Sequence, residues 1–117
     1  MTERTPHPFE ALGLLPGLSA SLSDAGIATP TAVQTEAIPA ILAGRDGVLV
    51  SPTGTGKTLA YLLPILQKLD GSRRETQAII LAPTQELAMQ IVREAEKYGT
   101  ALGIRTVALI GGAALSR

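Results

Sequence analysis

Apolar residues in this chain follow two patterns, helical spacing and short continuous runs. Helical spacing predicts four helices, over 14–25, 31–43, 57–69 and 84–102. Pro39 predicts that the second divides into two short helices, and Pro64 predicts a kink in the third. Continuous apolar runs predict three buried strands, Val48–Val50, Ala78–Ala82 and Ile104–Ile110. Strands that alternate with helices indicate an α/β fold, with a parallel sheet and flanking helices.

Composition narrows the class of protein. The chain has 117 residues and is 45% hydrophobic, which is typical of a single globular domain. Cysteine is absent, which excludes disulfides and thiolate metal sites and predicts a cytoplasmic location. Residues 1–8 are polar with two prolines, so we expect a disordered tail without a signal-peptide core. No apolar run is long enough to span a bilayer, so no membrane partner is expected.

Charge and aromatic content give no support for nucleic-acid binding by bulk properties. Lys+Arg and Asp+Glu are both 10, and aromatic residues are only 3%. Any contact with nucleic acid must therefore come from individually placed residues. The single histidine, His7, is interpreted as a solvated residue of the tail, which leaves no material for histidine catalysis or metal clusters.

A candidate phosphate-binding loop follows the first apolar run. Residues 51–58 read Ser-Pro-Thr-Gly-Thr-Gly-Lys-Thr. Gly54 and Gly56 let the backbone curl so that N–H groups point at phosphate oxygens, and the following helix adds its positive end. In this pattern Lys57 reaches the β- and γ-phosphates and the Thr58 hydroxyl holds Mg²⁺. The general pattern begins with glycine where this chain has serine, and the alternative is a surface turn rich in Gly and Thr.

Three further motifs lie in a fixed order around this loop. Upstream is Gly26-Ile27-Ala28-Thr29-Pro30-Thr31-Ala32-Val33-Gln34, with Phe9 seventeen positions before Gly26; downstream are Ala82-Pro83-Thr84-Gln85-Glu86-Leu87-Ala88 and Gly111-Gly112. Over residues 9–117 the chain closely resembles the N-terminal part of a DEAD-box RNA helicase. The four elements resemble its Q motif, motif I, motif Ia and GG motif. Ile27 stands where that family usually has an aromatic residue.

The resemblance implies a domain organisation and an ATP site. It implies a tail over 1–8, a Q-motif helical region over 9–44 and an incomplete RecA-like ATP-binding domain over 45–117. The cofactors would be ATP and Mg²⁺. The loop residues of the site would be Thr53, Gly54, Thr55, Gly56, Lys57 and Thr58, with Lys57 and Thr58 also catalytic and Thr58 the metal ligand.

The same resemblance assigns the adenine contacts. Gln34 would read adenine, Phe9 would stack on the ring, and Thr29 or Thr31 would tie the Q motif to the phosphate loop. The alternatives are a solvent-facing helix residue for Gln34, a staple of the domain for Phe9, and ordinary helix caps for the threonines.

RNA would bind through the remaining two motifs. Pro83, Thr84 and the N-terminus of the helix that follows them could hold an RNA phosphate. Gln85 replaces the arginine of the family pattern, which removes a charge-assisted contact and predicts weaker RNA binding. Gly111 and Gly112 would allow close approach of a sugar-phosphate strand. The alternatives are plain helix capping by Thr84 and a strand-to-helix turn at the glycines.

The printed sequence contains no Asp-Glu-Ala-Asp motif, no coupling motif and no second RecA-like domain. We therefore expect the nucleotide-binding, N-terminal part of an ATP-dependent RNA helicase. The full-length protein would couple ATP hydrolysis to local RNA unwinding, whereas this chain alone would be inactive. The alternatives are a non-catalytic nucleotide-binding or interaction fragment and another P-loop NTPase, which the Q motif argues against.

The family's strand order, if kept, places other strands between the three apolar runs. The runs would then not form a mutual hydrogen-bonded ladder. Their unpaired edges predict strand-swapped self-association of the chain.

Overall fold

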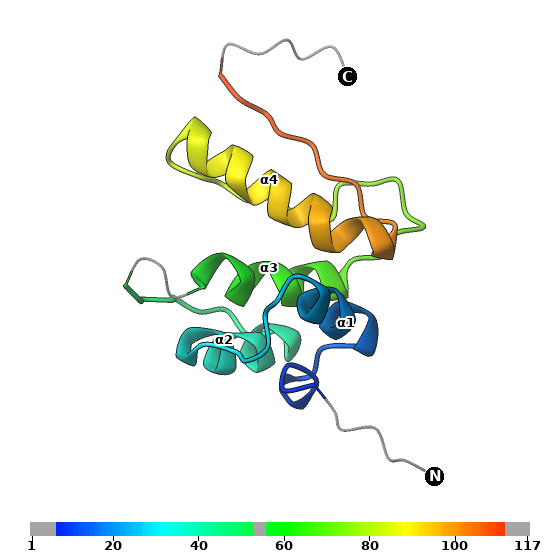
Figure 1. Ribbon diagram of the computed structural model, residues 1–117. Helices are drawn as coiled ribbons and strands as arrows, with labels where there is room; N and C mark the ends of the chain where they lie inside the picture. The colour runs from blue at the N-terminus through cyan, green and yellow to red at the C-terminus, as the bar shows by residue number, and fades with distance from the viewer. Residues whose placement is uncertain (1–6, 53–55, 112–117) are drawn as a thin grey trace. The chain divides into compact units, whose positions relative to one another are not determined.

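The computed structural model describes residues 7–52 and 56–111, in which helices are the regular elements. These are a 3₁₀ turn η1 (Glu10–Leu12), helices α1 (Pro16–Asp24), α2 (Ala32–Leu42), α3 (Lys57–Lys68) and α4 (Gln85–Gly99), and a 3₁₀ turn η2 (Thr100–Leu102) (Figure 1). The four expected helices are confirmed, with ends shifted by a few residues. None of these helices combines the length and the apolar character needed to cross a membrane.

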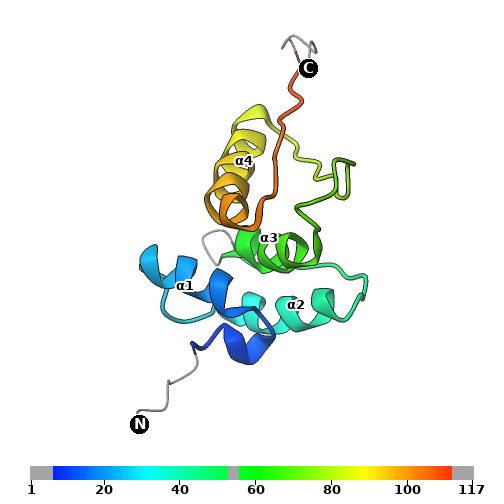
Figure 2. The ribbon, with the colours of Figure 1, turned by 90° about the vertical axis from the view of Figure 1, so that its right-hand side faces the viewer.

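The chain forms two compact units, Met1–Lys68 and Leu69–Arg117. In the first unit α2 packs along α3, and both views show them side by side (Figures 1 and 2). Apolar side chains of α1, α2 and α3 and of the residues that flank η1 form its core: Phe9, Leu14, Leu18, Leu22, Ala37, Ile38, Ala60, Leu62, Leu63 and Leu66. The unit boundary follows α3, whereas the sequence placed a boundary before residue 45, because α3 shares its core with α2.

Helix α2 continues through Pro39, so the prediction of two short helices is wrong. Thr31 caps the helix, since its Oγ1 accepts the Gln34 N–H at 3.4 Å. Pro39 removes the N–H that would bond the carbonyl of Thr35. Both residues are exposed, so water can bond that carbonyl and the helix survives. Helix α3 likewise runs through Pro64.

Two side chains fasten the end of α3 to distant parts of the first unit. Gln67 Nε2 donates to the carbonyl of Gly13 at 2.9 Å, while its Oε1 accepts the N–H of Leu15 at 2.7 Å. Lys68 Nζ donates to the carbonyl of Ile41 near the end of α2 at 3.3 Å. Polar bonds thus supplement the apolar core at this end of the unit.

In the second unit, α4 is an amphipathic helix with a polar loop before it. Thr84 Oγ1 accepts the N–H of Leu87 at 3.1 Å, which confirms the predicted cap. The buried residues of α4 are Ile91, Ala95, Tyr98 and Gly99. In the loop, Asp70 Oδ1 accepts the Ser72 N–H at 2.9 Å and the Ser72 hydroxyl at 2.6 Å. The hydroxyl bond, followed by the N–H bond, lowers the pKa of Asp70.

The three apolar runs predicted as strands are not paired, so the predicted parallel sheet is absent from the described residues. The runs are also not buried. Val48 and Val50 are each 90% exposed while Leu49 between them is 37% exposed, and Ile79 to Leu81 alternate in the same way. Such alternation is typical of extended backbone, which needs a neighbouring chain for its hydrogen bonds.

Candidate nucleotide-binding site

The first turn of α3 presents Lys57 and Thr58. Gly56 precedes the helix with φ +82°, and its carbonyl accepts the N–H of Ala60 at 3.1 Å, which closes the first helical turn. Backbone N–H groups in such a turn lack acceptors within the helix and carry its positive dipole end. Lys57 adds a full positive charge at the same place. The arrangement favours an anion such as phosphate.

Tyr61, one turn further along α3, is a partner of Thr58 that the sequence reasoning missed. Burial raises the pKa of Tyr61, and the Thr58 side chain beside it acts in the opposite direction. The signal available was their spacing of three positions, which brings side chains together on a helix. Tyr61 therefore lies beside the hydroxyl expected to serve Mg²⁺.

Gln34 joins the Q-motif segment to the phosphate loop. Its side chain is buried, at 3% exposure, so the alternative of a solvent-facing residue is wrong. Oε1 accepts the N–H of Thr31 at 2.9 Å, and Nε2 donates to the carbonyl of Gly56 at 3.1 Å. The expected tie between the two motifs is thus made by Gln34. Thr31 is its partner in a capping box, and Thr29 is exposed.

Glycine is required at position 56 for two reasons. Its φ of +82° is one that L-residues rarely adopt. A Cβ there would overlap Nε2 of Gln34 and would lie 3.4 Å from Cγ2 of Thr31. The close approach of Gln34 therefore depends on the missing side chain.

Phe9 lies in the core of the first unit. Its exposure is 0%, and its ring is stacked on that of His7 at 5.5 Å between centroids and 25° between planes. This is the position that the staple alternative describes. Phe9 has no exposed face for a base in this structure.

The residues expected to contact RNA are exposed at the start of α4 and beyond η2. Pro83, Thr84 and Gln85 surround the N-terminus of α4, where Thr84 is the cap. A Cβ on Gly111 would meet open space. Thr53, Gly54, Thr55 and Gly112 lie outside the described residues. Of the expected site residues, the structure brings together Gln34, Gly56, Lys57 and Thr58.

Comparison with known proteins places these motifs in a family. The DEAD/DEAH box helicase family matches residues 31–117. The chain is 47% identical over 102 residues to DEAD-box ATP-dependent RNA helicase CshC of Bacillus cereus, covering 87% of this chain and 26% of that protein. It is 50% identical over 121 residues to DEAD-box ATP-dependent RNA helicase 47B of Oryza sativa subsp. japonica, covering 93% and 21%. The chain thus spans about a quarter of the length of these relatives.

Solved structures also indicate the DEAD-box helicase family. The RNA-helicase Prp28 of Chaetomium thermophilum, bound to ADP, superposes with TM-score 0.82 at 38% identity, covering 97% of this chain and 30% of that one. Dbp5 of S. cerevisiae, bound to RNA and ADP BeF3, gives 0.79 at 33% identity, covering 85% and 26%. The neighbouring structures are RecA-like DEAD-box domains, so that part of the expected fold class is confirmed. The chain belongs to the DEAD/DEAH box helicase family.

Proposed function

We propose that this chain is the nucleotide-binding, N-terminal part of an ATP-dependent RNA helicase. The observation that carries the proposal is the bond from Gln34 Nε2 to the carbonyl of Gly56, at 3.1 Å. This bond connects Gln34, whose amide can hydrogen-bond a base, to the loop that leads into Lys57 and Thr58. The ADP-bound relative and the family membership support ATP as the ligand.

Gln34 retains the hydrogen-bonding capacity that adenine readout requires. A glutamine amide offers two N–H donors and two acceptor lone pairs. One N–H bonds Gly56 and one lone pair accepts from Thr31. The remaining donor and acceptor match N7 and N6 of adenine, whereas guanine presents two acceptors, N7 and O6, on that edge. Gln34 therefore favours ATP over GTP and holds the loop in place at the same time.

The phosphates and metal ion belong at the start of α3. Lys57 and the N–H groups of the first turn would stabilise the charge of the phosphates. Thr58, with Tyr61 beside it, would donate one oxygen ligand to Mg²⁺, an ion that commonly takes few protein ligands beside phosphate oxygens and water. The bound Mg²⁺ would neutralise charge that develops on the phosphates during hydrolysis.

RNA binding is proposed for the start of α4. The Thr84 hydroxyl oxygen accepts from Leu87, which leaves its O–H to donate to a phosphate oxygen. Pro83, Gln85 and Gly111 are exposed and accessible to a strand. The neutral Gln85 makes this contact weak. RNA in the solved Dbp5 complex supports nucleic acid as the partner of the full-length protein.

Isothermal titration of the chain with ATP·Mg²⁺ and GTP·Mg²⁺ tests the proposal. Gln34→Ala should weaken ATP binding by about 1–3 kcal/mol, the cost of leaving a buried polar group unpaired. Gln67→Ala is a matched control, because it removes another doubly bonded glutamine of the same unit at the far end of α3. Equal affinity of the wild type for ATP and GTP would contradict adenine readout. Equal effects of the two variants would show that Gln34 acts through stability alone.

A further inference from the structure

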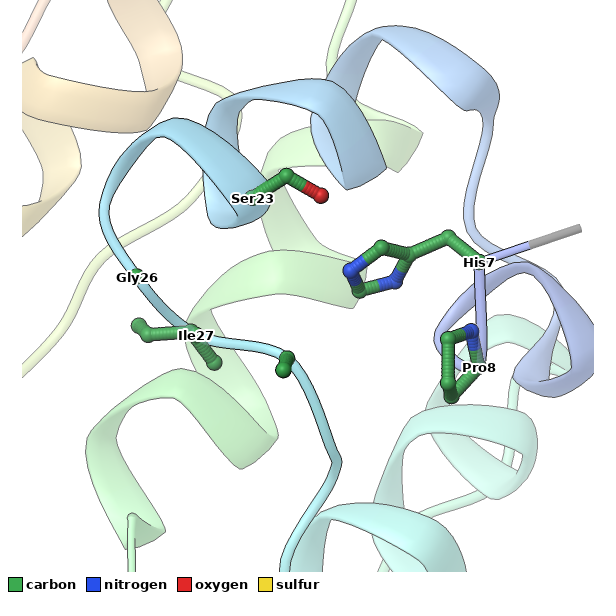
Figure 3. A pocket seen from close by; sticks show the side chains of 6 residues that line it. His7, Pro8, Ser23, Gly26 and Ile27 are labelled. Carbon is green, nitrogen blue, oxygen red and sulfur yellow. The ribbon is translucent and has the colours of Figure 1, made fainter.

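We draw no further inference here: the strongest candidate, the apolar surface that Val107 and Leu109 expose on the extended segment after η2, carries none because nothing in the structure shows what covers it, while the cavity lined by His7 and Ile27 (Figure 3) belongs to the nucleotide site already described.

Discussion

Substitution of Gly56 by alanine tests the contact between the Q motif and the phosphate loop. A left-handed backbone costs an L-residue about 1–2 kcal/mol. The new Cβ would also overlap Nε2 of Gln34, and loss of that hydrogen bond costs about 0.5–1.5 kcal/mol more. We therefore expect Gly56→Ala to lower the free energy of unfolding by about 1.5–3.5 kcal/mol.

Gly26→Ala is the matched control for this substitution. Gly26 has nearly the same φ, +81°, but a Cβ there meets nothing within 4 Å. It should cost only the backbone strain, about 1–2 kcal/mol. Urea unfolding followed by far-UV circular dichroism measures both variants, each alone and combined with Gln34→Ala.

The combined variants decide the cause of the difference. In the Gln34→Ala background the overlap is gone, so Gly56→Ala should cost no more than Gly26→Ala. Equal costs of the two glycine variants in the wild-type background would refute the close-approach argument. So would a cost at Gly56 that is unchanged when Gln34 is removed.

Three other predictions concern charge, backbone and pH. Lys57→Ala should keep the helical circular dichroism signal and lose ATP binding by calorimetry, because the side chain is half-buried at the start of α3 and takes no part in the core; wild-type affinity would contradict the phosphate assignment. Gly71→Ala should destabilise the second unit, because its Cβ would overlap the backbone oxygen of Leu102, which cannot rotate away as a side chain can; an unchanged urea midpoint would contradict this. Burial raises the pKa of both tyrosines, Tyr61 and Tyr98, above the ordinary 10.0. The tyrosines therefore contribute fully to stability below pH 10, and this contribution is lost as the pH rises past 10. Titration of phenolate absorbance should show midpoints above 10.0. Midpoints at 10.0 would contradict the burial.

Local features were the predictable part of the fold. Thr31 and Thr84 were recognised as helix caps because a cap bonds a backbone N–H only three residues away. Pro39 misled the prediction because its effect depends on exposure, which the sequence does not state. The apolar runs have the composition of buried strands, but a strand is completed by partners from elsewhere, and the described residues provide none.

In the candidate site, too, the local features were predictable from the sequence and the contacts between distant residues were not. Lys57, Thr58 and Gly56 follow from a contiguous motif, and the structure places them at one helix start. The bond from Gln34 to Gly56 joins positions 22 apart, and spacing alone favoured a solvent-facing residue. Phe9 lies in the core, where the sequence suggested a ring stacked on adenine, and His7, expected in a solvated tail, lines a cavity.

The two hydrogen bonds of the Gln67 side chain have a consequence for synthesis on the ribosome. They reach Leu15 and Gly13, which lie 52 and 54 positions earlier in the chain. Leu18 and Leu22 of α1 are buried in the folded first unit, and they leave the ribosome well before α3, which belongs to the same unit. At about 5–20 residues per second, the 45 positions from Leu22 to Gln67 take roughly 2–9 seconds to translate. During that interval the nascent N-terminal segment exposes its leucines, which makes it a substrate for chaperones that bind apolar segments.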